Sequence, residues 1–288
     1  MIVVAGATGK LGRQIVSELL KLTGPEQIAV SVRDPSKADD LAAHGVRVRR
    51  GDFENPASLA DAFEGATQLL LVSSNASASG KDPIAQHRNA MEAARSAGVQ
   101  RIVYTSHMGA SPTSAFPPMH DHATTEALLA ESGIAWTALR NGFYASTVPM
   151  LIGDAAANGA IEAPQDGAVA WTTHADLAAA AARILIDEGS FDGPTPPLTG
   201  DKAYDLDDVA SILSEQTGRT IERRTIADEE QAQRLAGYGL PPTVVDITLA
   251  IYRAARAGEF AATDPMLASL IGRTPVGLGD VLARSSEG

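Results

Sequence analysis

The chain has 288 residues, 44% of them hydrophobic and 20% charged, which is typical of a globular protein with one large domain or two modest ones. Its formal net charge of −12 argues against a nucleic-acid partner, because phosphate contacts need a basic surface. The absence of cysteine excludes disulfides, thiolate catalysis and cysteine-ligated metals. An apolar run that starts at residue 2 leaves no room for a signal peptide, and no stretch is long enough to span a bilayer. We therefore expect a cytoplasmic protein without a membrane partner.

The first element is the most informative part of the sequence. An apolar run over residues 2–5 leads into a turn with glycines at 6, 9 and 12, and apolar residues at helical spacing follow. Glycines let the backbone approach a pyrophosphate, while a helix start offers free N–H groups and the positive end of its dipole. Between a strand and a helix, this motif predicts a nucleotide-binding turn. The expected contacts are Gly6, Thr8, Gly9, Lys10, Leu11 and Gly12.

Strands and helices alternate through about residue 145. Strands are predicted over residues 2–5, 28–32, 46–49, 68–73, 101–105 and 135–139. Asn55-Pro56 and Asp82-Pro83 each place a capping residue before a proline in the first helical turn. This alternation predicts an α/β fold, a Rossmann-type doubly wound parallel sheet with helices on both faces.

Beyond residue 145 the alternation breaks down. Helices are predicted near 175–186 and over 205–216, 227–236 and 242–257, and the proline- and glycine-rich stretch 191–200 is typical of a loop. We divide the chain into a dinucleotide-binding Rossmann domain, residues 1–145, with later segments returning to its sheet, and a smaller, mostly helical substrate-side lobe, residues 146–288. The lobe is expected over the carboxyl edge of the sheet, where ligands bind in such folds.

Polar residues follow the predicted strands at this edge. Arg33 ends the second strand, where an arginine can pair with the 2′-phosphate of NADP, unless it is simply a solvated strand end. Asp34, in Asp-Pro-Ser, is typical of a turn. Asp52 either accepts a hydrogen bond from adenine or makes a turn before a helix. NADP(H) is thus favoured over NAD(H), and further cofactor contacts are expected from Lys37, Phe53, Ser73, Ser74, Thr105 and Ser106, with Lys10 and Arg13 adding positive charge.

The substrate pocket is expected beside the fifth and sixth strands. A long loop follows the fifth strand, and its residues Phe116 and Met119 indicate either a lid over an apolar ligand or simple anchoring. The predicted substrate contacts are His107, Met108, Phe143 and Tyr144. Arg140, which precedes Phe143 and Tyr144, either lies beside the pocket or forms a structural ion pair. Asp176 is interpreted as a residue of a first helical turn.

Five segments, in order, resemble a known family: GATGKLG, SVRDPSKA, HRNAMEAARSAGVQRIVYTS, HDHATTEALLAESGIAWTALRNGFY and PLTGDKAYDLDDVASILSEQTGR. They look like the atypical short-chain dehydrogenase/reductases of the NmrA-like group, above all the type 2 NAD(P)H quinone oxidoreductases and the triphenylmethane dye reductases. The resemblance spans residues 1 to about 220. It implies an extended Rossmann fold and direct use of NADPH without flavin. Some family members are instead redox sensors that bind the nucleotide without turnover.

The chain departs from the wider superfamily at its Tyr-x-x-x-Lys pair, whose positions hold Pro118 and His122. A simple ketone needs an acid, because its reduction creates an alkoxide. A quinone instead gives a delocalised hydroquinone anion, and a cationic triarylmethane dye accepts hydride at carbon. The sequence therefore predicts an NADPH-dependent reductase of quinones or similar electron-poor aromatics, with a redox sensor as the alternative.

His122 is expected to contact the nicotinamide ribose or the substrate, or merely to begin a helix. Together with Asn141 and Tyr144 it forms the predicted catalytic set. A metal site at His107, His120 and His122 with Asp121 is disfavoured, because their spacing matches no ligand pair borne by a helix. Neither flavin nor metal is expected, the partner is a small aromatic molecule, and a homodimer is left open.

Overall fold

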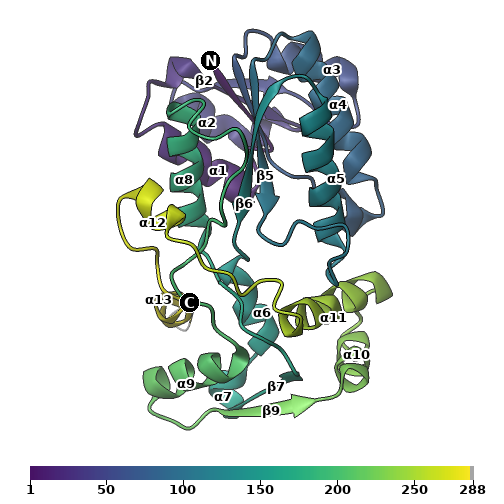
Figure 1. Ribbon diagram of the computed structural model, residues 1–288, viewed down its shortest axis with the longest axis vertical. Helices are drawn as coiled ribbons and strands as arrows, with labels where there is room; N and C mark the ends of the chain where they lie inside the picture. The colour runs from purple at the N-terminus through teal and green to yellow at the C-terminus, as the bar shows by residue number, and fades with distance from the viewer. Residues whose placement is uncertain (286–288) are drawn as a thin grey trace.

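A parallel seven-stranded sheet forms the centre of the protein, for which the computed structural model describes residues 1–285 (Figure 1). Residues 286–288, the end of the predicted substrate-side lobe, lie outside the described part. The strand order β3-β2-β1-β4-β5-β6-β8 confirms the predicted Rossmann-type fold. The strands are β1 (Ile2–Ala5), β2 (Ile28–Val32), β3 (Arg47–Arg50), β4 (Gln68–Leu71), β5 (Arg101–His107), β6 (Ala135–Asn141) and β8 (Gly193–Pro194).

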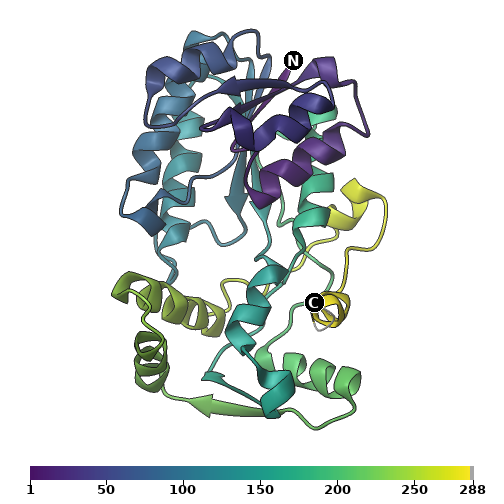
Figure 2. The ribbon, with the colours of Figure 1, turned by 180° about the vertical axis from the view of Figure 1, so that it is seen from behind.

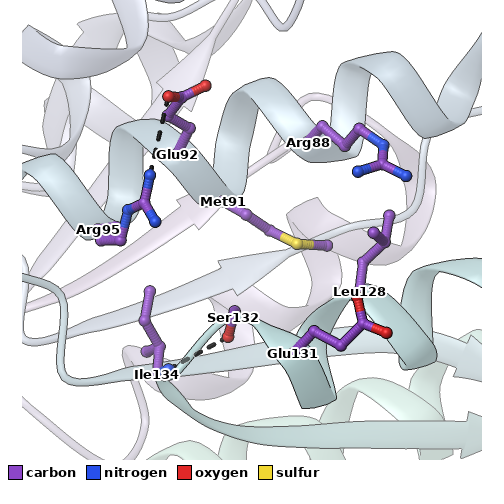
Figure 3. A pocket seen from close by; sticks show the side chains of 8 residues that line it. All are labelled: Arg88, Met91, Glu92, Arg95, Leu128, Glu131, Ser132 and Ile134. Atoms are coloured by element: carbon purple, nitrogen blue, oxygen red, sulfur yellow. Dashed lines mark hydrogen bonds and ion pairs between the residues drawn. The ribbon is translucent and has the colours of Figure 1, made fainter.

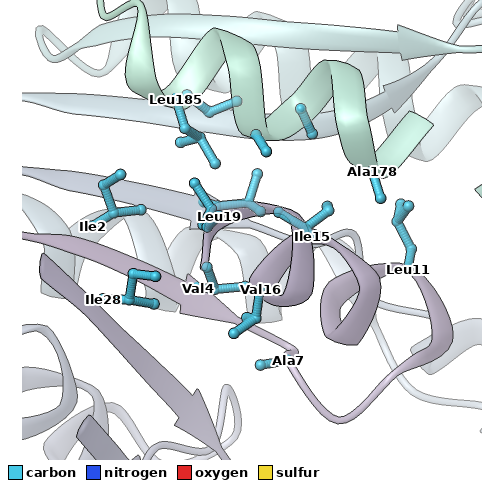
Figure 4. Packing of buried hydrophobic residues seen from close by; sticks show 14 of the residues in the cluster. Ile2, Val4, Ala7, Leu11, Ile15, Val16, Leu19, Ile28, Ala178 and Leu185 are labelled. Atoms are coloured by element: carbon cyan, nitrogen blue, oxygen red, sulfur yellow. The ribbon is translucent and has the colours of Figure 1, made fainter. Parts of the chain in front are cut away.

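Helices cover both faces of this sheet. One face carries α1 (Lys10–Leu19), α8 (His174–Ile186) and α12 (Met266–Ile271), and the other carries α3 (Pro56–Phe63), α4 (Pro83–Ser96) and α5 (Pro118–Glu131). The apolar residues Leu11, Ile15 and Leu19 recur every four positions, so α1 buries one side. That side packs with Ala178 and Leu185 of α8 (Figure 4). Shorter turns are η1 (Pro25–Gln27), η2 (Pro35–Ala38), α2 (Asp39–Ala43), η3 (Ala76–Ser79) and η4 (Ala145–Thr147).

The two predicted helix caps behave differently. The Asp82 carboxylate accepts hydrogen bonds from the backbone N–H groups of Ile84 and Ala85, at 2.8 and 3.1 Å, and so caps α4. Asn55 occupies the predicted N-cap position of α3, before Pro56, but its side chain makes no cap hydrogen bond. Instead the Ser58 hydroxyl donates to the Asn55 carbonyl oxygen at 2.7 Å and closes the first turn.

A smaller lobe lies at one end of the sheet in both views (Figure 1, Figure 2). It comprises α6 (Val148–Ile152), α7 (Ala155–Asn158), β7 (Ala160–Pro164), α9 (Leu206–Thr217), β9 (Glu222–Ile226), α10 (Asp228–Gly237), α11 (Pro242–Arg256) and α13 (Leu278–Ser285). The parallel pair β7–β9 was not expected from the sequence, because three of the five residues of β9 are charged. The longest helix, α11, has 15 residues, and none within the described part can cross a membrane.

Segments of the C-terminal half return to the sheet. The two-residue strand β8 pairs with Thr137 and Ala138 of β6, inside the stretch interpreted as a loop. The fully buried Asp176 of α8 accepts from the Val276 backbone N–H at 2.9 Å and pairs with Arg273 at 2.6 Å. Asp176 is therefore more than a first-turn residue, since it anchors the segment between α12 and α13 on α8.

Candidate active site

The turn between β1 and α1 is shaped to hold an anion. Gly6 has a positive φ of 80°, which favours glycine, and a Cβ on Gly12 would lie only 2.5 Å from the Gly6 carbonyl oxygen. The turn therefore packs directly on the helix. No side chain caps α1, which leaves its first backbone N–H groups available at the positive end of the helix dipole. This arrangement fits the pyrophosphate of a dinucleotide.

The end of β2 carries an unpaired cation. Arg33 is exposed, and its guanidinium makes no hydrogen bond or ion pair with any residue in 1–285. Arg13, in contrast, pairs with Asp40 and donates to the Lys37 carbonyl oxygen, so its charge is already engaged. The Asp34 carboxylate accepts from the hydroxyl and backbone N–H of Ser36, which lowers its pKa and confirms the predicted turn. The exposed Lys37 lies on η2 in the same region.

The Asp52–Phe53 pair follows β3. One oxygen of Asp52 accepts from the Glu54 backbone N–H at 3.0 Å, as the turn interpretation expects. Its other oxygen has no hydrogen-bond partner in the described part of the chain, so an adenine contact at Asp52 stays a prediction. Phe53 is half-buried, and its carbonyl accepts from the Asn89 amide at 2.8 Å.

Polar residues at the ends of β4 and β5 mainly bond to protein groups. The Ser73 backbone N–H donates to Thr105 at 2.8 Å, and the Ser74 backbone N–H donates to His87 Nε2 at 2.9 Å. The Ser106 hydroxyl donates to buried Glu126 at 2.6 Å. Glu126 also forms a two-point ion pair with Arg140, at 2.7 and 3.2 Å, so Arg140 is a structural ion-pair residue.

His122, in the first turns of α5, has a partner that the sequence analysis missed. Its Nδ1 lies 2.9 Å from the phenolic oxygen of Tyr104, a fully buried residue of β5. Burial lowers the pKa of His122 to about 3, so the ring is neutral near pH 7. Nδ1 is engaged whichever atom donates, which leaves Nε2 for a ligand. Tyr104 lies in a predicted strand, but the sequence does not indicate which helix residue contacts its side chain.

Aromatic side chains gather beside His107. Its ring makes edge-on contacts with Phe143 and Phe260, at centroid distances of 5.3 and 5.4 Å. Phe143 in turn contacts Phe116 and Trp171. We call these five residues the aromatic cluster. Phe260 follows α11, more than a hundred positions after Phe143 in the chain. Nothing in the sequence therefore connects Phe260 with the site.

The long loop after β5 is anchored. Phe116 and Met119 are buried, as simple anchoring expects. Glu259, just after α11, accepts from the Ala115 backbone N–H at 2.8 Å and from the Ser114 hydroxyl. The Nε2 atom of His120 is hydrogen-bonded to the Ser114 carbonyl oxygen at 2.9 Å. Within residues 1–285 no group of three or more acidic or histidine side chains is arranged to hold a metal.

Asn141 and Tyr144 follow β6. Asn141 is 2% exposed, and its Oδ1 has no hydrogen-bond partner in the described part of the chain. Its backbone carbonyl accepts from the Met108 N–H at 2.9 Å, which places Met108 beside it. Tyr144 stacks on His174 at a centroid distance of 4.1 Å. Burial raises the pKa of Tyr144 to about 12 and lowers that of His174 to about 4, so both are neutral near pH 7.

A cavity of about 330 Å³ lies elsewhere, between α4 and α5 (Figure 3). It is lined by the apolar side chains Met91 and Leu128 and by charged side chains such as Arg88 and Glu131. None of the predicted site residues lines it. The candidate site is instead the carboxyl edge of the sheet, where the β1–α1 turn and the ends of β2, β4, β5 and β6 meet.

Comparisons with known proteins identify the family of this chain. A family model described as NAD(P)H-binding matches residues 6–188. This protein belongs to that family. Quinone oxidoreductase 2 of Escherichia coli is 37% identical over 97% of this chain and 96% of its own length. The crystal structure of the NADPH complex of the E. coli NADPH-dependent quinone oxidoreductase has a TM-score of 0.92 at 36% identity, covering 99% of this chain and all of that one. Citrobacter triphenylmethane reductase with NADP(H) has a TM-score of 0.89 at 34% identity, with 99% and 100% coverage.

Family membership confirms the predicted resemblance to the NmrA-like reductases. The protein is an NAD(P)H-dependent oxidoreductase with a nicotinamide cofactor. The uncapped α1 and the tight glycine turn are features that this cofactor can use. The individual contacts assigned to these residues stay predictions.

Two glycine variants distinguish a loss of cofactor binding from a loss of packing in the β1–α1 turn. A Cβ on Gly9 would meet only the Gly6 carbonyl oxygen, at 3.4 Å, whereas one on Gly12 would clash. Gly9→Ala should keep the wild-type melting temperature yet bind NADPH about 10-fold to 100-fold more weakly, as expected for a lost contact to a charged group. Gly12→Ala should lower the melting temperature as well. Calorimetry measures the melting temperatures, and a fluorescence titration measures the affinities for NADPH. Unchanged affinity in Gly9→Ala would contradict the assignment of this turn to the cofactor.

Proposed function

We propose that this oxidoreductase uses NADPH, in preference to NADH, to reduce quinones or similar electron-poor aromatic molecules without flavin or metal. One observation carries the proposal. His107 of the aromatic cluster and His122, whose ring centroid lies 6.1 Å from that of His107, are both neutral near pH 7, because burial lowers their pKa values to about 3. A site without a ready proton donor suits an acceptor whose reduced form needs no immediate proton. The named activities of the quinone oxidoreductase and triphenylmethane reductase relatives support the same substrate class.

The residues of this chain have distinct tasks in the proposal. A bound NADPH supplies a hydride, which is two electrons and one proton, and is left as NADP⁺. The β1–α1 turn and Arg33 hold its phosphates, and His122 Nε2 orients the nicotinamide ribose or the substrate. Phe143 and Tyr144 contact the flat face of the acceptor and exclude water. Orientation in a dry site supplies much of the rate enhancement for such a transfer.

Steady-state oxidation of NADPH with a panel of benzoquinones and naphthoquinones tests the proposal. We expect purified protein without absorbance above about 400 nm, as for a flavin-free enzyme, to reduce quinones when NADPH alone is added. Turnover that appears only after flavin is supplied would contradict the direct transfer. Tight NADPH binding without turnover on any quinone or dye would support the redox-sensor alternative instead.

Cofactor preference depends on Arg33. NADPH should bind more tightly than NADH, and Arg33→Ala should narrow that difference by about 10-fold to 100-fold through loss of one charge-assisted contact. Arg47→Ala is the matched control, because Arg47 begins β3 at the opposite edge of the sheet. Both dissociation constants are measured by fluorescence titration. Equal affinity of the wild type for the two nucleotides would overturn the assignment.

His122 should position a ligand and not act as an acid. Because its pKa of about 3 lies below the assayed range, the ring stays neutral and kcat should be flat from about pH 5.5 to 8.5. His122→Ala should raise KM, with a fall in kcat well short of the ~10²–10⁴-fold expected for a lost acid. His122→Gln, which keeps one hydrogen-bonding group, should be milder. A collapse of kcat in both variants at unchanged KM would identify His122 as a proton donor.

A further inference from the structure

We infer that His107 and Asn141 form a polar subsite for substrates that bear a carbonyl oxygen. His107 Nε2–H donates to the carbonyl oxygen of the substrate, and Asn141 Oδ1 accepts from the hydroxyl of the reduced product. The inference rests on the proposed function and deepens it. It predicts a difference between the two expected kinds of substrate, quinones and cationic triarylmethane dyes. A quinone presents carbonyl oxygens to such a subsite, whereas a cationic triarylmethane dye accepts hydride at carbon and has no oxygen there.

The hydrogen bond at the other ring nitrogen fixes the tautomer of His107. The backbone N–H of Gly109 donates to His107 Nδ1 at 3.0 Å. Nδ1 must therefore carry a lone pair, and the proton of the neutral ring lies on Nε2. Burial, and next the neighbouring His122, lower the pKa of His107 to about 3, so this tautomer persists across the physiological range. Nε2 has no hydrogen-bond partner within residues 1–285.

Two phenylalanine rings of the aromatic cluster hold the His107 donor in place. Phe143 and Phe260 contact the imidazole edge-on from two different parts of the chain. The loop that supplies the Gly109 N–H is itself tightly packed, because a Cβ on Gly109 would lie 2.8 Å from Phe260. A donor fixed among apolar rings needs little reorganisation when charge develops on a ligand, and the low polarity strengthens its hydrogen bond.

Asn141 supplies the second half of the subsite. The parallel register pairs His107 of β5 with Asn141 of β6, and residues paired in this way lie side by side. Asn141 is almost fully buried, and its Oδ1 lacks a partner in the described part of the chain. An unsatisfied buried amide oxygen is costly, so a ligand that donates to it gains affinity. A hydroquinone hydroxyl is such a donor.

The chemistry of the acceptor matches this pair. Addition of hydride, two electrons and one proton, converts a quinone into the hydroquinone monoanion, and one further proton from water completes the hydroquinone. The negative charge gathers on oxygen, where the hydrogen bond from His107 Nε2–H becomes charge-assisted and stronger. His107 keeps its proton throughout. Once protonated, the product hydroxyl can donate to Asn141 Oδ1.

The test compares two acceptors in one enzyme. His107→Phe keeps the aromatic packing and removes the donor, while His107→Gln keeps an N–H near the position of Nε2. In His107→Phe we expect the ratio of kcat/KM for a benzoquinone to kcat/KM for a cationic triarylmethane dye to fall about 10-fold to 100-fold, as for loss of a hydrogen bond to a charged group that only the quinone makes. His107→Gln should recover most of the quinone activity.

Melting temperature and the NADPH dissociation constant serve as controls, and both should be close to wild type. Equal losses with quinone and dye, or a His107→Gln variant no better than His107→Phe, would overturn the inference. A wild type that reduces neither acceptor would refute the proposed function itself, so the two failures are distinct. If His107→Phe does not fold, Asn141→Leu decides: hydroquinone product inhibition should weaken about 10-fold, and unchanged inhibition would contradict the subsite.

Discussion

The parallel register between β5 and β6 is the constraint on which the candidate site depends. It sets His107 opposite Asn141 and ends both strands at the same edge of the sheet. Because side chains alternate along a strand, a slip of one residue would turn His107 away from the aromatic cluster and Tyr104 away from α5. Tyr104 holds His122 only while its side chain reaches that helix. Donor, acceptor and positioning groups therefore share one structural origin, the pairing of two buried strands.

Burial then determines the chemistry that this geometry can support. Desolvation disfavours the charged form of each imidazole, so His87, His107, His122 and His174 all have pKa values of about 3 to 4. The same desolvation raises the pKa of Tyr144, which makes its proton harder to release. A site of this kind orients and stabilises but does not readily protonate. Such a site suits substrates for which hydride delivery is the difficult step and proton delivery is not.

Much of the sheet could be predicted from the sequence, because β1, β2 and β4 are buried throughout and consist of apolar residues except for Ser31 and Gln68. The glycine turn could be predicted as well, since the strand, the turn and the helix are adjacent in the chain. The short or charged strands β8 and β9 carry no such pattern. The partnerships of Tyr104 with His122, of Phe260 with His107 and of Asp176 with Arg273 join distant segments, and only packing decides them.

These long-range contacts also explain how the two halves of the chain divide the work. The predicted nucleotide site is local, because it is built from strand ends and from the turn that follows β1. The aromatic cluster is not, because Trp171 and Phe260 come from beyond β6 and meet Phe143 at the edge of the sheet. Glu259, next to Phe260, also fixes the loop after β5. A change in the lobe that shifts α11 would therefore reshape the substrate side through Phe260 while leaving the β1–α1 turn intact. Substrate range can thus vary within such a fold without loss of the cofactor.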